Sequence, residues 1–389
     1  MDTLLFRYHN LLKETNTNFL RYLHDIIPWN DRMIAIVGSR GVGKTTMLLQ
    51  HIKLHLPIEK TLYVSADDLY FSDHSLFDLA RHFHQMGGEH LFIDEIHKYA
   101  NWSQELKNIY DAIPQLQVVF TGSSILDIYH GTSDLSRRVL TFTLNGMSFR
   151  EYVAMKKGIQ IPVHSMEDIL QHKVNTKGLD YPLAVFRDYL RQGYYPFADN
   201  AGFDIRLINV VNRVIETDIP LYAKLNISSV VKMKRLLNVI AASVPFKPNV
   251  SKLAGIMDIS RETVNDYLEY MTRAKLLNAL HESTQGIRGL GKVDKIYLEN
   301  TNLAYTLTPS PEIGNIRETF FLNQLQVNHQ VQAAAKSDFL IDGIYTFEIG
   351  GENKKQKQIT GTMDAFVVKD DIEYGVFNVI PLWHFGLLY

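Results

Sequence analysis

Cysteine is absent from the 389 residues of this sequence. Its absence excludes disulfide bonds, catalysis by a thiol and zinc sites built on thiolates, and it fits a reducing compartment. Long apolar runs are missing as well, so no segment approaches the about 20 residues that a membrane-spanning helix needs. Asp2, Arg7 and His9 interrupt the first ten residues, which is atypical of a signal peptide. We therefore expect a cytoplasmic protein without a membrane partner.

An excess of positive charge is also lacking. Lysine and arginine number 40 against 42 aspartates and glutamates, for a formal net charge of −2, so any surface for nucleic acid must be local. The apolar share of 46% is ordinary for a globular protein. The length indicates two or three domains.

A phosphate-binding pattern follows the apolar run Met33–Val37. Between this run and a helical pattern, the residues fit G-x-x-x-x-G-K-[ST]. Glycines allow the backbone to curve so that its N–H groups face a polyphosphate. Lys44 is expected to reach the β- and γ-phosphates of ATP, and Thr45 to bind Mg²⁺. An ordinary glycine-rich turn is the alternative. The predicted ATP-binding residues are Gly38, Ser39, Arg40, Gly41, Val42, Gly43, Lys44, Thr45 and Thr46.

A second apolar run, Leu91–Ile93, ends in two acids. We predict that Asp94 belongs to the Mg²⁺ shell and that Glu95 orients or deprotonates the attacking water. Two solvated acids at a strand end are the alternative, which the P-loop upstream and the alternating strands and helices between the two motifs disfavour. Together the two motifs predict an ATPase with ATP and Mg²⁺ as cofactors.

Two further positions are candidates for the same site. Ser123 follows the predicted strand Gln117–Thr121, where a small polar side chain can contact the γ-phosphate or the attacking water; a helix cap at the neighbouring Ser124 is the alternative. Arg137 and Arg138 can offset charge on the γ-phosphate, within the chain or across a subunit interface. A pair of basic surface residues is the other interpretation.

With these motifs the sequence resembles the prokaryotic AAA+ superfamily ATPases that carry a C-terminal domain of unknown function with a restriction-endonuclease-like core. The matching residues are the P-loop with Arg40, Asp94–Lys98 with Trp102, Thr121–Ser124, Leu135–Val139, Met147–Tyr152, Gly193–Pro196 and the C-terminal segment. The resemblance implies an ATP site at the carboxyl ends of a parallel sheet. Where the family usually has glycine before its conserved arginine, this chain has Arg137, and alignment favours Arg138 as the catalytic arginine.

The expected fold class is α/β. It comprises a P-loop NTPase (AAA+) with a doubly wound parallel sheet, a helical and winged-helix middle, and a small α/β endonuclease-like C-terminal domain. The expected parts are N-terminal helices at 1–30, the AAA+ core at 31–150, a helical region at 151–247, a winged helix at 248–300 and the restriction-endonuclease-like domain at 301–389.

The pattern over Asn249–Leu280 predicts a helix-turn-helix, which can place a recognition helix on DNA. Acids outnumber Arg261 on the helix that would enter the groove, and acids near phosphates are repelled. These acids are Glu262, Asp266 and Glu269. A structural winged helix that acts as a lid or partner surface is therefore the favoured interpretation.

Near the C-terminus, Glu318, Asp338 and Glu348 match in order the acids of PD-(D/E)XK nucleases, whose carboxylates hold Mg²⁺ for phosphodiester hydrolysis. Lysine is expected two residues after Glu348, where this chain has Gly350. The lysines close enough to replace it are Lys354, Lys355 and Lys357. Without such a lysine, we predict a nuclease fold with lost or weak activity.

Taken together, the sequence predicts that ATP hydrolysis drives or gates a conformational change that a protein partner reads, in a chain that can form a homo-oligomer. A first alternative is an ATP-gated protein that binds DNA or cuts it. A second is a switch that holds ATP and hardly hydrolyses it.

Overall fold

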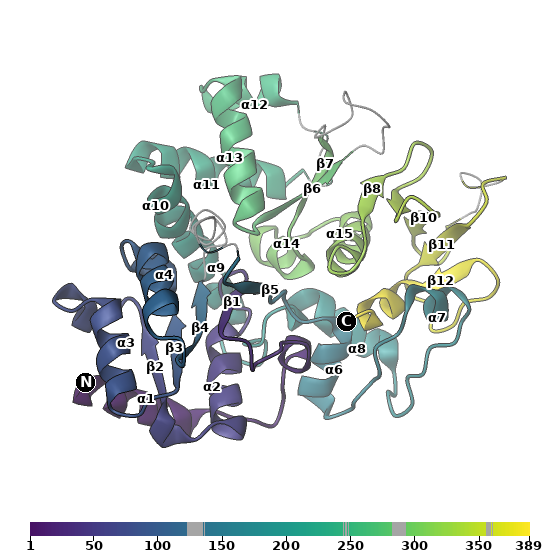
Figure 1. Cartoon of the computed structure of the whole chain (residues 1–389). Coiled ribbons are helices and arrows are strands. Elements are labelled where there is room, and N and C mark those ends of the chain that lie inside the picture. The colour runs from purple at the N-terminus through teal and green to yellow at the C-terminus, as the bar shows by residue number, and fades with distance from the viewer. Residues whose placement is uncertain are drawn as a thin grey trace. The chain divides into compact units, whose positions relative to one another are not determined.

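A computed structural model describes residues 1–122, 135, 137–243, 245, 247, 249–281, 293–354, 359 and 361–389. It divides into two compact units, an N-terminal unit of Met1–Gly146 and a C-terminal unit of Met147–Tyr389, whose elements Figure 1 labels. Among the described residues, no helix combines the length and the apolar character that crossing a bilayer requires.

The N-terminal unit is built on a five-stranded parallel sheet with the strand order β2-β3-β4-β1-β5. The strands are β1 (Met33–Val37), β2 (Thr61–Ser65), β3 (His90–Asp94), β4 (Gln117–Gly122) and β5 (Leu140–Thr143). Because all five strands are parallel, their carboxyl ends meet at one edge of the sheet, and ligands bind at that edge in folds of this class. The predicted parallel sheet is confirmed.

Helices cover both faces of this sheet (Figure 1). Within the described residues of this unit, the α-helices are α1 (Asp2–Glu14), α2 (Lys44–His55), α3 (Leu76–Gln85) and α4 (Trp102–Ala112). Alternate residues of β3 point to opposite faces. Leu91 and Ile93 lie in the core that contains residues of α3 and α4, whereas Phe92 approaches His51 of α2, with 6.3 Å between ring centroids.

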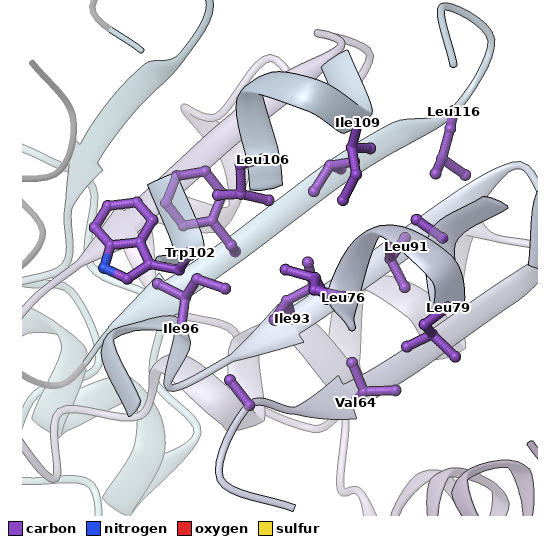
Figure 2. Packing of buried hydrophobic residues seen from close by; sticks show 14 of the residues in the cluster. Val64, Leu76, Leu79, Leu91, Ile93, Ile96, Trp102, Leu106, Ile109 and Leu116 are labelled. Carbon is purple, nitrogen blue, oxygen red and sulfur yellow. The ribbon is translucent and has the colours of Figure 1, made fainter. Parts of the chain in front are cut away.

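The core between the sheet and helices α3 and α4 is shown in Figure 2. Side chains spaced three residues apart on each helix, Leu76 and Leu79 on α3 and Leu106 and Ile109 on α4, are at most 1% exposed. This spacing places them on the face of each helix that packs on the sheet. The packing fixes the ends of β2 and β3, from which polar side chains of the candidate site project.

The region 1–30, where N-terminal helices were expected, contains the helix α1. After α1 the chain forms a 3-10 turn at Tyr22–Asp25 and no second α-helix before β1. The side chain of Asn16 accepts a hydrogen bond from the backbone N–H of Asn18 at 2.7 Å. Local bonds of this kind compete with helix formation.

The C-terminal unit is largely helical, with a β-hairpin and a mixed sheet. Its helices are α6 (Phe149–Lys157), α7 (Met166–Leu170), α8 (Pro182–Asp188), α9 (Phe203–Arg213), α10 (Ile219–Ala223), α11 (Ile227–Ala241), α12 (Val250–Met257), α13 (Arg261–Arg273), α14 (Thr301–Leu307) and α15 (Ile313–Leu325). The hairpin pairs β6 (Leu277–His281) with β7 (Val293–Leu298). Segments Tyr189–Gly193 and Val214–Asp218 continue α8 and α9 as π-helix.

The mixed sheet has the strand order β12-β11-β10-β9-β8. Its strands are β8 (Val331–Ala333), β9 (Phe339–Ile341), β10 (Tyr345–Gly350), β11 (Ala365–Lys369) and β12 (Val379–Pro381). Strands β10, β11 and β12 are parallel, whereas β8, β9 and β10 are antiparallel. Phe321 of α15 packs on Phe339 and Phe347, each at 5.2 Å between ring centroids, so this helix lies against the sheet.

Candidate functional site

The P-loop leaves β1 and ends where α2 begins. Gly41 and Gly43 have φ angles of 86° and 97°, in the left-handed region that glycine adopts most readily. Gly38 is required for a different reason, because a Cβ there would lie 2.4 Å from the backbone oxygen of Leu144. The loop is thus a tight turn that leads into the N-terminus of α2, a position suited to phosphate.

Two buried cations hold this loop. The Nζ of Lys44 donates to the backbone oxygens of Gly38, at 2.8 Å, and Ser39, at 3.0 Å. Arg21, which directly precedes the 3-10 turn Tyr22–Asp25, donates to the backbone oxygen of Val42 and, at 2.8 Å, to that of Asn145. Arg21 therefore ties the loop to the segment that follows β5.

Asp94 lies at the carboxyl end of β3 and is 3% exposed. The hydroxyl of Thr45 donates to its Oδ2 at 2.5 Å, and the hydroxyl of Tyr63 donates to the same oxygen at 2.9 Å. The hydroxyl of Thr121 donates to Oδ1. Three neighbouring elements (the start of α2, β2 and β4) therefore converge on one carboxylate, as the parallel strand order requires.

Tyr63 is a dependable donor in this arrangement. Burial, and next the charge of Asp94, raises the pKa of the Tyr63 phenol well above its usual value. The phenol therefore keeps its proton across the physiological range and continues to donate to Asp94.

Glu95 follows in a left-handed conformation with φ of 52°. Its backbone N–H donates to the hydroxyl of Thr121 at 3.3 Å. One carboxylate oxygen lies 3.5 Å from the guanidinium of Arg40 in the P-loop and 3.5 Å from Nε2 of His97. The unusual backbone turns this side chain toward the loop, where a base for the attacking water is needed.

The donor set fits magnesium. Mg²⁺ prefers oxygen ligands and is usually held by one or two protein side chains together with substrate phosphates and water. The Thr45 hydroxyl and the Asp94 carboxylate meet at hydrogen-bond distance beside the loop that Lys44 closes. The structure therefore brings together Thr45, Asp94 and Glu95, which the sequence placed in one site.

Two of the predicted catalytic residues are not part of this geometry. Ser123 lies outside the described residues. Arg138 forms a two-bond ion pair with Asp111 at the end of α4, at 3.1 and 3.2 Å. That helix end precedes β4, so the pair lies near the amino ends of the strands, at the edge opposite the P-loop. A role for Arg138 at the nucleotide site would need the site of another copy of the chain.

A second group of charges lies in the C-terminal unit, around the predicted nuclease acids. Lys295 on β7 approaches Glu318 at 3.3 Å and Asp338 at 3.9 Å, so these two acids gather around one cation. Lys354 forms an ion pair with Glu348, which is 2% exposed. Of the lysines considered as replacements at Gly350, Lys354 reaches Glu348, while Lys355 and Lys357 lie outside the described residues.

The pKa values of Glu318 and Glu348 are both raised above the usual value of a glutamate. Burial, and next the charge of Asp338, raises the pKa of Glu318. Burial also raises the pKa of Glu348, against the opposing effect of its bond with Lys354. Acids that repel one another in this way are stabilised by added positive charge, which the two lysines supply here.

Sequence reasoning missed Arg21 and Tyr63. Tyr63 is in the apolar run of β2, where it is indistinguishable from an ordinary core residue. Only the pairing of β2 with β3, which places Ser65 opposite Asp94, brings the phenol to the carboxylate. Arg21 lies among apolar residues far from the P-loop in sequence, and no motif marks it as a contact of that loop.

Comparison with known families agrees with this geometry. Residues 30–153 match the model of a family described as an AAA domain. Residues 183–312 match a domain of unknown function (DUF8612). An AAA domain is thus present in this part of the chain, which confirms that part of the resemblance. The restriction-endonuclease-like core is not confirmed and stays a prediction.

An uncharacterized protein of Methanocaldococcus jannaschii is 27% identical over 296 residues, which make up 70% of this chain and 62% of that protein. The chain thus spans less than two thirds of this relative.

Similar solved structures include C. elegans PCH-2, with a TM-score of 0.26 and 17% identity over 69% of this chain and 67% of that one. The S. cerevisiae Hsp104–ADP complex has a TM-score of 0.29 and 17% identity over 69% and 41%. AMPPCP-bound DnaA from Aquifex aeolicus has a TM-score of 0.26 and 14% identity over 69% and 86%.

Proposed function

We propose that the chain binds ATP with Mg²⁺ at Gly38–Thr46 and hydrolyses it. The AAA domain over residues 30–153 supports nucleotide binding. The observation that carries the proposal is the 2.5 Å hydrogen bond from Thr45 to Asp94, because it places a hydroxyl and a carboxylate together at the start of the helix that follows the P-loop. That pair is the ligand set for a nucleotide-bound magnesium ion.

Each residue has a separate task in this proposal. The backbone N–H groups of the loop and the ammonium of Lys44 hold the phosphates. Thr45 and Asp94 hold Mg²⁺, which neutralises charge that develops on the phosphates. Glu95 accepts a proton from the attacking water or orients it. Tyr63 and Thr121 fix the carboxylate of Asp94 and so the position of the ion.

Removal of the metal tests this function. Phosphate release from ATP is expected in the presence of Mg²⁺ and is expected to fall to background in excess EDTA. A preparation of Asp94→Asn made in the same way controls for contaminating ATPases and should remain at background in both conditions. Equal rates with Mg²⁺ and EDTA would contradict the proposal, whereas bound but unhydrolysed ATP would favour the switch.

For the C-terminal unit we propose a partner-binding role that ATP hydrolysis gates. Residues 248–300 contain α12, α13 and the β6–β7 hairpin, an order typical of a winged helix. On α13 Arg273 is paired with Glu269 at i and i+4, which further reduces the positive charge available to DNA. A protein surface is therefore the better match for this helix.

Hydrolysis of phosphodiester bonds is the second candidate function, and Lys354 favours it. A Cβ at Gly350 would lie 2.5 Å from the side chain of Lys354. The lysine thus packs over the position where PD-(D/E)XK nucleases carry theirs. Lys295 argues against this function, because it lies between Glu318 and Asp338, where a bridging divalent cation would have to bind.

We expect no cleavage when wild-type protein is incubated with supercoiled and linear DNA in Mg²⁺ or Mn²⁺. The reason is that Lys295 and Lys354 already neutralise the acids on which a catalytic ion depends. The same incubation with ATP should show a rate of hydrolysis that DNA does not change. Cleavage by wild type that disappears in Asp338→Ala would reverse this assignment and make the chain a nuclease.

A further inference from the structure

Three histidines gather in the N-terminal unit, away from the P-loop. His51 and His55 are four residues apart on α2 and so lie on one face of that helix. His24 comes from the 3-10 turn Tyr22–Asp25. Each of the three offers one ring nitrogen, and these atoms all lie within 4.8 Å of one another.

Two ring nitrogens of this cluster are buried without a hydrogen-bond partner among the described residues. They are Nε2 of His24 and Nδ1 of His51. Each of these side chains is only 6% exposed. Buried polar atoms without a partner are rare and costly. Two such atoms in side chains that approach each other are suited to bind one cation.

We propose that His24, His51 and His55 form a binding site for a divalent transition metal ion, and that zinc fits it best. Neutral imidazoles are good zinc ligands, and three protein ligands with one open position is a common zinc arrangement. His55 is exposed, so the fourth position is accessible to water.

Ring spacing supports this assignment. A zinc–nitrogen bond of about 2.0–2.1 Å puts an imidazole centroid about 3.2 Å from the ion, and a tetrahedral angle then separates two centroids by about 5.2 Å. The centroid separations in the structure are 5.5 Å for His24–His51, 5.4 Å for His24–His55 and 5.2 Å for His51–His55. The rings thus already stand at the spacing that a tetrahedral ion imposes.

The surroundings orient two of the ligands. Nδ1 of His24 lies 3.3 Å from a carboxylate oxygen of Asp25. A proton held there leaves the lone pair on Nε2 for the metal, as carboxylates do beside many zinc-bound histidines. Trp29 stacks on His51 at 3.8 Å between ring centroids and donates from Nε1 to the backbone oxygen of His24. One tryptophan therefore packs on the ring of His51 and holds the backbone of His24.

Electrostatics favour an ion at this place. His51 and His55 lie in the last turns of α2, and the C-terminal end of a helix attracts cations. The alternative to a metal site is that the three histidines serve only as aromatic packing. In that case the cluster would bind no ion, so a binding measurement distinguishes the two.

Cobalt titration tests the site, because tetrahedral Co²⁺ absorbs visible light strongly. EDTA-treated full-length protein, without nucleotide, is titrated with Co²⁺ and then with competing Zn²⁺. We expect one tetrahedral Co²⁺ per chain, displaced by one Zn²⁺. His55→Ala, at an exposed position that should not disturb folding, should weaken Zn²⁺ binding by at least about 10–100-fold.

His82→Ala is the matched control, because His82 is also exposed on a helix (α3) and lies outside the cluster. It should bind both ions as wild type does. His51→Phe, which keeps an aromatic ring against Trp29, should lose the cobalt absorption while remaining folded by circular dichroism. Wild-type protein without tetrahedral Co²⁺, or equal affinities for wild type and His55→Ala, would overturn the proposal.

Discussion

Glu95→Gln is expected to lower the rate of ATP hydrolysis by about 10²–10⁴-fold, the usual contribution of general-base catalysis, while ATP binding is retained. The amide keeps the size of the side chain and cannot accept the proton of the attacking water. The side chain of Glu95 contacts Arg40 and His97, whereas Thr45 and Asp94 bond to each other, so the expected Mg²⁺ ligands should be undisturbed. Single-turnover phosphate release and nucleotide titration on the same preparation measure the two effects separately.

The matched control is Glu89→Gln. Glu89 lies just before the same strand, at its opposite end, and pairs with Lys60 on the surface at 2.7 Å. This variant should hydrolyse ATP at the wild-type rate, because surface pairs contribute little to stability. Wild-type turnover by Glu95→Gln would remove Glu95 as the base. Loss of ATP affinity in step with rate would make it a binding residue instead.

The residues of the proposed nucleotide site could be brought together from the sequence because their pattern is local. The loop Gly38–Thr46 and the pair Asp94–Glu95 each follow a strand, and parallel strands bring such ends together. What local patterns cannot supply is the identity of the neighbouring strand. The hydroxyl of Tyr63 reaches Asp94 only because β2 lies next to β3 in the sheet. Spacing along the chain does not encode which strands are neighbours.

The charges of the C-terminal unit show a second limit of the same kind. Glu318, Asp338 and Glu348 were expected together from their order in the chain. The cations that neutralise them were harder to predict. Lys295 lies on the β6–β7 hairpin, before α15, and Lys354 follows Gly350. Neither lysine is at the expected position, two residues after Glu348. A long lysine side chain can reach the same partner from several positions in the sequence, so the spacing alone does not identify which lysine pairs with which acid.

Only part of the histidine cluster can be recognised in the sequence. His51 and His55 have the i, i+4 spacing of paired metal ligands on a helix. Their partner His24 is separated from them by β1 and the P-loop, so the spacing along the chain does not connect the three residues. The absence of cysteine excludes only zinc sites that are built on thiolates. Arg138 is a residue that the sequence assigned to the active site and the structure places elsewhere. Its ion pair with Asp111 holds it at the edge of the sheet opposite the P-loop.

Lys44→Ala should weaken ATP binding by about 10- to 150-fold, since a hydrogen bond to a charged group contributes about 1.5–3 kcal/mol. In the structure Lys44 is 5% exposed and its ammonium lies on the backbone of Gly38 and Ser39, in the middle of the loop. Alanine removes the one side-chain charge that reaches into the loop from α2, while the left-handed glycines keep the turn.

Lys53→Ala provides the control for this variant. Lys53 lies on the same helix, but its ammonium donates to the backbone oxygens of Leu12 and Thr15, at 3.0 and 2.8 Å. The change removes an equal charge from α2 without touching the P-loop. It should therefore leave nucleotide affinity unchanged.

Titration of a fluorescent ATP analogue with Mg²⁺ into wild type, Lys44→Ala and Lys53→Ala is the most direct test of nucleotide binding at Gly38–Thr46. Binding there predicts equal affinities for wild type and Lys53→Ala and an affinity for Lys44→Ala that is lower by about 10-fold or more. Equal affinities for wild type and Lys44→Ala would contradict nucleotide binding at this loop.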